Sequence, residues 1–155
     1  MTDASFEDGH EAPLNLGALD GEDLTVISAL VQDAVFPATE MRWDRGANRF
    51  ALLINRFRWE EGPARALSPE RVQSLLVFEG VRGVASNGID RKDGDTVLSI
   101  LSVAFEEVDA PGGHMILTLA GDGAIRLSVE ALEVALKDVT KPYVAPSKKT
   151  PGHPE

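Results

Sequence analysis

Cysteine is absent from this 155-residue chain, and its absence removes several kinds of chemistry at once. Without thiolates there is no disulfide, no iron–sulfur cluster, no thiolate zinc site and no cysteine nucleophile. Histidine is scarce as well, and His10, His114 and His153 form no pair at the short spacing that metal sites use. We therefore expect no metal and no cofactor, and a cytoplasmic location is the default.

Lysine and arginine are missing from the first 41 positions, which hold nine acids. The formal net charge of the whole chain is −10, and this sign repels phosphate backbones, which argues against nucleic acid as a partner. The acidic start lacks the basic and apolar stretches of a secretory signal. No apolar run approaches the ~20 residues that span a bilayer, so we expect no membrane partner.

Signatures of catalysis are missing too. Adjacent carboxylates such as Glu60-Glu61 and Glu106-Glu107 point to opposite faces of a strand, which favours solvated groups over a catalytic pair. The Gly121–Gly123 segment joins two predicted strands instead of opening a helix, so it indicates a turn and not a phosphate loop. No serine stands in a nucleophile-elbow context. The sequence thus favours a protein that is not an enzyme.

The chain divides into three parts. Residues 1–13 are acidic and poor in large apolar side chains, so we expect a mobile start. Residues 141–155 contain four prolines and no periodicity, which predicts a disordered tail rich in proline and lysine, without helix or strand. A single domain over residues 14–140 lies between them.

Two segments fit either a helix or a strand. For residues 24–35 helix is favoured, because Asp20 is a suitable N-cap, acids follow it in the first turn and Pro37 follows the end. Residues 130–139 could form a helix capped by Ser128, or a strand that turns Leu132, Val134 and Leu136 inward. Helix is the favoured interpretation there as well.

Elsewhere the apolar period is two, which predicts strands. A hairpin is expected at 41–43 and 50–59, followed by a loop at 60–69, strands at 71–78 and 81–85, a polar connection up to residue 95, and an antiparallel meander at 97–106, 115–120 and 125–129. The strand at 97–106 is expected to be buried on both faces near its start. The fold class is α+β, a mostly antiparallel curved sheet or β-roll with one or two helices. A roll closed by a C-terminal helix, as in pleckstrin-homology-like folds, satisfies this pattern.

The predicted hairpin interleaves arginines with aromatic residues. It carries Arg42, Arg45, Arg49, Arg56 and Arg58 together with Trp43, Phe50, Phe57 and Trp59, and Asp44 is the only acid from position 42 to 58. Guanidinium groups beside aromatic rings suit phosphates, carboxylates or stacked bases. A plainer interpretation, which we favour, pairs the arginines with acids of the first 41 residues and places the aromatic rings in the core.

Alternation within a strand places Arg56 and Arg58 on the same face. Clustered like charges are unfavourable unless negative groups lie between them. We therefore predict that Arg56 meets an acidic partner, which is Asp33, another acid of the chain or a bound anion.

Several segments resemble one protein family. They are VISALVQDAV (26–35), FALLINRFRWE (50–60), NGID (87–90), VLSILSVAFE (97–106) and GAIRLSVEALEVALKDV (123–139). The chain is similar at these segments to an alphaproteobacterial domain-of-unknown-function family, number 2948. The resemblance implies a bacterial cytoplasmic protein whose gene often neighbours that of histidinol dehydrogenase, and it carries over no catalytic residue.

The leading functional hypothesis is a non-enzymatic binding or protein-interaction module that holds a small acidic ligand or a protein partner with the arginine and aromatic hairpin. The alternative is a small enzyme, or an accessory to one, with a polar site. The candidate ligand-binding residues are Gln32, Asp33, Asn55, Arg56, Trp59 and Asp90. A third hypothesis is a homodimer that pairs exposed apolar strand faces across a two-fold axis.

Overall fold

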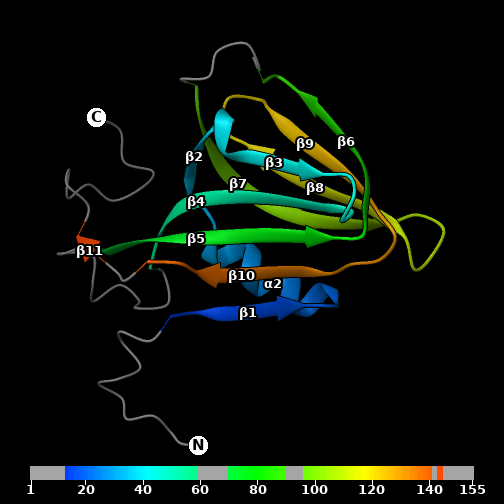
Figure 1. The fold of residues 1–155 in the computed structure, drawn as a ribbon, viewed down its shortest axis with the longest axis horizontal. Coiled ribbons are helices and arrows are strands. Elements are labelled where there is room, and N and C mark those ends of the chain that lie inside the picture. The colour runs from blue at the N-terminus through cyan, green and yellow to red at the C-terminus, as the bar shows by residue number, and fades with distance from the viewer. Residues whose placement is uncertain (1–12, 59–69, 90–95, 141–142, 145–155) are drawn as a thin grey trace, which may run out of the picture.

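A curled antiparallel sheet dominates the computed structural model, which describes residues 13–58, 70–89, 96–140 and 143–144 (Figure 1). The strands pair in the order β1-β10-β5-β4-β2-β7-β8-β9-β6, with β3 beside β4 and β11 beside β5. Their bounds are β1 Asn15–Ala18, β2 Val35–Pro37, β3 Met41–Asp44, β4 Arg49–Phe57, β5 Glu70–Glu79, β6 Val81–Asn87, β7 Val97–Glu107, β8 Gly113–Leu119, β9 Ala124–Val129, β10 Val134–Asp138 and β11 Tyr143–Val144. The predicted α+β class and the predicted hairpin β3–β4 are confirmed.

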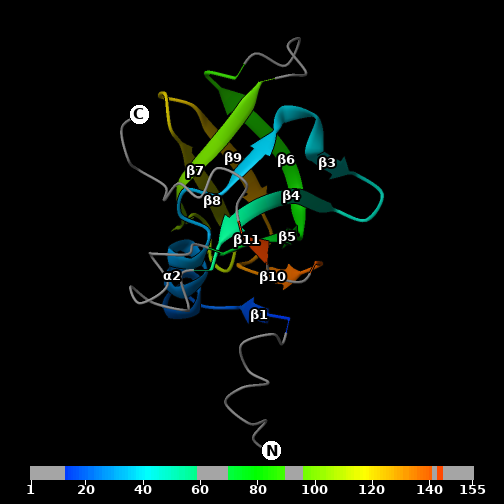
Figure 2. The same cartoon turned by 90° about the vertical axis from the view of Figure 1, so that its left-hand side faces the viewer.

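Helix α2, Gly21–Leu30, packs against β7 and β1, as Figures 1 and 2 show. The Asp20 carboxylate caps it by accepting a hydrogen bond from the Asp23 N–H at 2.9 Å. The predicted helix is therefore confirmed, but it ends at Leu30 and not at residue 35. Asp33 adopts a φ of 66° in the turn that leads into β2, and a 3₁₀ turn, Ala38–Glu40, then leads into β3.

We expect Asp20→Ala to lower the free energy of unfolding by about 1 kcal/mol, because it leaves one of the first N–H groups of α2 without an acceptor. Asp20→Asn keeps a side-chain acceptor and is the matched control. Urea denaturation measures both. A midpoint for Asp20→Ala equal to that of Asp20→Asn would show that the cap contributes nothing.

The core lies where the two ends of the sheet cross. Strands β1, β10, β5 and β4 run across β7, β8, β9 and β6, and helix α2 covers one open side (Figure 2). Fully buried side chains from both halves meet there, among them Phe36, Leu76 and Leu117. Strand β6 follows β5 directly after Gly80, and because Glu79 of β5 pairs with Arg49, the start of β6 lies beside the start of β4, where the Val81 N–H donates to the Asn48 carbonyl at 2.8 Å.

Two predictions within the sheet are wrong. Residues 134–138 form strand β10 and not a helix, because Leu132, Val134 and Leu136 alternate inward between β1 and β5. A C-terminal helix that closes the roll is thus absent from the described residues, and the helix that packs on the sheet is α2. Strand β7 is not buried on both faces at its start, since Val97 is 63% exposed and Leu98 is buried.

A register shift between Ile100 and Ser102 explains the pattern of β7. The inward face changes from Leu98 and Ile100 to Val103, and this shift leaves Leu101 on the surface. A β-bulge produces this change because one extra residue reverses the alternation of side chains. Simple period-two alternation would instead place Leu101 and Val103 on the same face.

Some predicted segments fall wholly or partly outside the described residues. The loop at 60–69 does so, as does the polar connection at 90–95. The start at 1–13 is described only at Pro13. Within the predicted tail, Tyr143 and Val144 pair with Arg71 and Glu70 of β5, so two residues of that segment are a strand.

Candidate functional site

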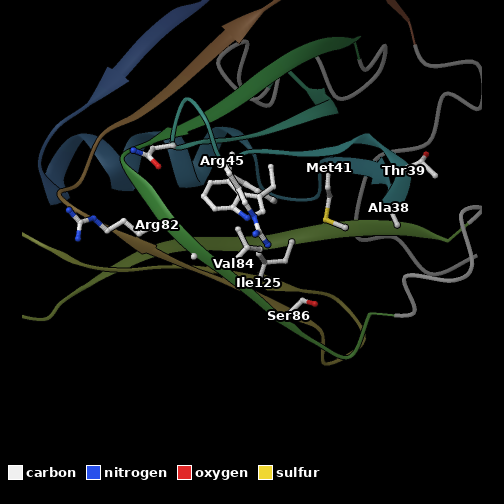
Figure 3. A pocket seen from close by; sticks show the side chains of 12 residues that line it. Ala38, Thr39, Met41, Arg45, Arg82, Val84, Ser86 and Ile125 are labelled. Atoms are coloured by element: carbon white, nitrogen blue, oxygen red, sulfur yellow. The ribbon is translucent and has the colours of Figure 1, made fainter.

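A groove of about 650 Å³ lies between strands β3 and β6 (Figure 3). These strands are far apart in the order of the sheet, and the curl brings them together. The groove is lined by Ala38, Thr39, Met41, Trp43, Arg45, Asn48, Phe50, Arg82, Gly83, Val84, Ser86 and Ile125. A cavity of this size with a largely apolar and aromatic lining is typical of a ligand site.

The two walls of the groove are edge strands. Among the described residues, β3 pairs with β4 alone and β6 pairs with β9 alone. At one end of the groove, the hydrogen bond from Val81 to Asn48 joins β6 to the turn between β3 and β4. From that end the strands diverge, as Figure 3 shows, so the groove widens toward Thr39 and Ser86.

Strand alternation supplies the apolar surface of the groove. Met41 and Trp43 stand two residues apart on β3 and are both half-buried, whereas Arg42 between them is exposed. Val84 on β6 and Ile125 on β9 form the opposite wall, and Figure 3 shows Met41 pointing toward that wall.

Two guanidinium groups give the groove its charge. Arg82 lies at the narrow end and is paired with Glu130 at 2.9 Å, with both side chains largely in solvent. Arg45 follows β3 in the hairpin turn, and Figure 3 shows its side chain reaching toward Val84 and Ile125. The described residues offer the Arg45 guanidinium no carboxylate within ion-pair distance. The groove therefore combines an apolar lining with a cation that can receive an anionic group.

Arg56, the centre of the site predicted from sequence, lies elsewhere in a buried network. Its Nη2 donates to Asp138 Oδ1 at 2.9 Å and Oδ2 at 3.2 Å, and its Nε donates to Ser74 Oγ at 3.0 Å. Ser74 Oγ donates in turn to Asp138 Oδ1 at 2.7 Å, and the Leu14 N–H donates to Asp138 Oδ2 at 2.9 Å. The predicted acidic partner of Arg56 is confirmed, and it is Asp138 rather than Asp33.

Two other arginines of the predicted hairpin, Arg49 and Arg58, also pair with acids that follow it in the sequence. Arg58 donates to Glu70 at 2.7 Å and Arg49 donates to Glu79 at 2.9 Å. The described ion pairs of the hairpin thus use acids outside the first 41 residues, but the acids at positions 3, 7, 8 and 11 lie outside the described residues, so that part of the plainer interpretation stays a prediction. Its other part is confirmed for Phe50 and Phe57, which are buried.

The structure brings only part of the predicted set together. Asn55 and Arg56 are adjacent on β4, and Val35, two residues after Asp33, pairs with Asn55. Gln32 is exposed in the same turn as Asp33. Trp59 and Asp90 lie outside the described residues. Whether these six residues bind a ligand stays a prediction.

Sequence reasoning missed one wall of the groove. The hairpin that carries Trp43 and Arg45 was identified by its composition, but nothing local marks Val84 or Ile125 as neighbours of it. Their proximity depends on the curl of the sheet at Gly80, where the chain leaves β5, whose Glu79 pairs with Arg49, and enters β6. A prediction of that curl would have found the second wall.

A smaller cavity of about 350 Å³ lies at the β7–β8 turn and shares Arg82 with the groove. His114, on β8, contributes to its lining. The described part of the chain holds no group of three or more histidine, aspartate or glutamate residues placed to bind a metal ion. In the same residues, no helix is long and apolar enough to cross a membrane.

Comparison with known proteins identifies a family but no characterised relative. Neither the curated proteins nor the solved structures contain a match to the chain. The model of the family described as "Protein of unknown function (DUF2948)" matches residues 14–153. The match covers nearly all of the sequence, including the hairpin and both walls of the groove. The chain therefore belongs to the DUF2948 family of proteins of unknown function.

Proposed function

We propose that this protein is a binding module and that the groove between β3 and β6 holds a ligand with an apolar body and an anionic group. The observation that carries the proposal is the position of Arg45 beside Met41, Trp43 and Val84. A guanidinium over an apolar surface binds a carboxylate or phosphate more strongly than one in open solvent, because fewer water molecules compete for it.

The composition of the lining favours binding over catalysis. No aspartate, glutamate or histidine is among the described residues that line the groove. General acid–base catalysis requires such a group within hydrogen-bond reach of the reacting atoms. The lining offers Thr39, Asn48 and Ser86 as polar groups, and these can orient a ligand.

Octanoate is the simplest probe of this chemistry, because it joins a flexible apolar chain to a carboxylate. We expect octanoate to raise the thermal midpoint of the full chain, since a ligand that binds only the folded state stabilises it. Octanol lacks the carboxylate and acetate lacks the apolar chain, so each should raise the midpoint less. Differential scanning fluorimetry with the three compounds at equal concentration makes the comparison.

The matched variants are Arg45→Ala and Arg42→Ala. Both change an exposed arginine of the same hairpin, but Arg42 donates to the Thr39 carbonyl at 2.7 Å and does not line the groove. We expect Arg45→Ala to abolish the advantage of octanoate over octanol and Arg42→Ala to keep it. If both variants respond to octanoate as the wild type does, the groove is not the site of binding.

Three further expectations from the sequence are kept as proposals. We infer an alphaproteobacterial source and a cytoplasmic location from the family resemblance, and a fluorescent fusion in the source organism tests the location.

A homodimer is supported by the exposed apolar residues Val97 and Leu101 on β7. Sedimentation equilibrium tests the dimer, and a monomer at high protein concentration would exclude it.

A further inference from the structure

The walls of the groove have a property that a pocket for a small molecule does not require. Each wall is the outer edge of a strand whose other edge is already paired, β3 with β4 and β6 with β9. At the narrow end of the groove, the Val81 N–H of β6 donates to the carbonyl of Asn48 in the turn between β3 and β4. Backbone N–H and C=O groups along an open edge are a template for another strand.

Strand β6 is the better template of the two. It has seven residues, whereas β3 has four. The start of β6 is protected in the way that natural edge strands are, by the register shift between Val81 and Gly83 and by the charge of Arg82. Beyond the shift, Val84 and Ala85 carry no charge and introduce no bulge or proline. This part of the edge lacks the features that normally prevent strand addition.

From these observations, and resting on the proposed function, we infer that the ligand is an extended peptide segment of a partner protein. The segment pairs as an added strand with β6 near Val84 and Ala85. Every second side chain of the peptide then faces the apolar surface of Met41 and Trp43, because side chains of a strand alternate.

Charge complementarity specifies the peptide further. Arg45 reaches over the apolar side chains of Val84 and Ile125, whereas Arg82 is largely in solvent and paired with Glu130, and no acid is among the described residues that line the groove. A segment with alternating apolar residues and at least one aspartate or glutamate fits this surface. A basic segment would bring a like charge next to the Arg45 guanidinium and would be disfavoured.

A library of random nine-residue peptides displayed on phage, selected against the full chain, provides the probe. We expect the enriched sequences to share apolar residues at alternate positions and at least one acid. Each enriched sequence is then synthesised with blocked ends, and fluorescence anisotropy measures its affinity. Arg45→Ala should weaken binding by about tenfold, as expected for the loss of a charge-assisted hydrogen bond, and Arg42→Ala should leave it unchanged.

Backbone methylation distinguishes strand addition from other modes of binding. In an edge strand only alternate N–H groups of the peptide face the template. Two versions of the best peptide therefore carry N-methyl groups at odd or at even positions. We expect one version to lose affinity by about tenfold or more and the other to lose much less.

Three results would overturn the inference. The first is an equal loss of affinity with the two methylation patterns. The second is a selection that enriches no acidic and apolar peptide. The third is a dimer of this chain that the variant Val84→Arg dissociates, because the occupant of the groove would then be a second copy. If octanoate still raises the thermal midpoint when one of these results is obtained, the proposal of a binding module stands and only the peptide ligand is excluded. If octanoate has no effect but the peptide still pairs with β6, the proposed preference of the groove for an apolar body with an anionic group is excluded instead.

Discussion

Replacing Arg56 with alanine is expected to lower the free energy of unfolding by about 3–5 kcal/mol, because the change leaves the carboxylate of Asp138 buried without its cation. The side chain of Arg56 is 0% exposed and that of Asp138 is 3% exposed, so water does not replace the lost partner. Ser74 and the Leu14 N–H still donate to the carboxylate, but neither carries a charge. Urea denaturation followed by circular dichroism measures the loss.

Two controls separate the charge effect from simple truncation. Arg49→Ala removes an arginine from the same strand, but its pair with Glu79 is half in solvent, so we expect a loss within about 1 kcal/mol. The double variant Arg56→Met with Asp138→Leu removes both charges and keeps apolar volume. It should recover about 1–4 kcal/mol relative to Arg56→Ala. If Arg56→Ala lowers the free energy of unfolding no more than Arg49→Ala does, the buried network contributes little to stability.

Once the strands are assigned correctly, the sequence alone indicates where the network around Arg56 lies. On β4 the inward residues are Phe50, Leu52 and Ile54, and Arg56 continues the row. A charged residue that continues a row of core side chains must be paired. The acidic partner of Arg56 was predicted on another ground, because Arg56 and Arg58 share a face and like charges there require a negative group between them.

The identity of the partner could not be predicted, because residues 130–139 were interpreted as a helix. As a strand, Val134 and Leu136 point inward and Asp138 is the next residue in the same row. Ser74 stands in a similar row on β5, and it pairs in register with both Ile54 and Asp138. Helix propensity and strand alternation are both satisfied by this short segment, and only its position between β1 and β5 decides between them.

The groove shows the other limit of local reasoning. The aromatic and basic composition of the hairpin drew attention to Trp43 and Arg45. The opposite wall depends on a long-range curl of the sheet, on the turn at Gly80, which has a φ of 69°, and on the bulge that follows it. Periodicity fixes which residues share a face of one strand, but it contains no information on which two edges meet.

Strand β8 begins at a glycine for which we expect the second large effect on stability. A Cβ atom on Gly113 would overlap the carbonyl oxygen of Glu106 and lie 2.8 Å from two ring carbons of Phe105. Gly113 is buried and pairs with Glu107 on one side and with Val129 on the other. Because the atom it would meet first belongs to the backbone of a paired strand, the clash cannot be relieved by rotating a side chain.

We therefore expect Gly113→Ala to lower the free energy of unfolding by about 3 kcal/mol, at the upper end of the usual cost of overpacking. Gly17→Ala is the control, since Gly17 lies on the exposed edge strand β1 and the nearest atom to its added Cβ is the Val134 oxygen at 3.9 Å. That variant should be neutral or should gain about 0.4–1 kcal/mol through the lower entropy of its unfolded chain. Denaturation midpoints in urea compare the two. Equal midpoints would mean that β7 and β8 can separate at this point without cost, which the antiparallel pairing from Phe105 to Glu107 argues against.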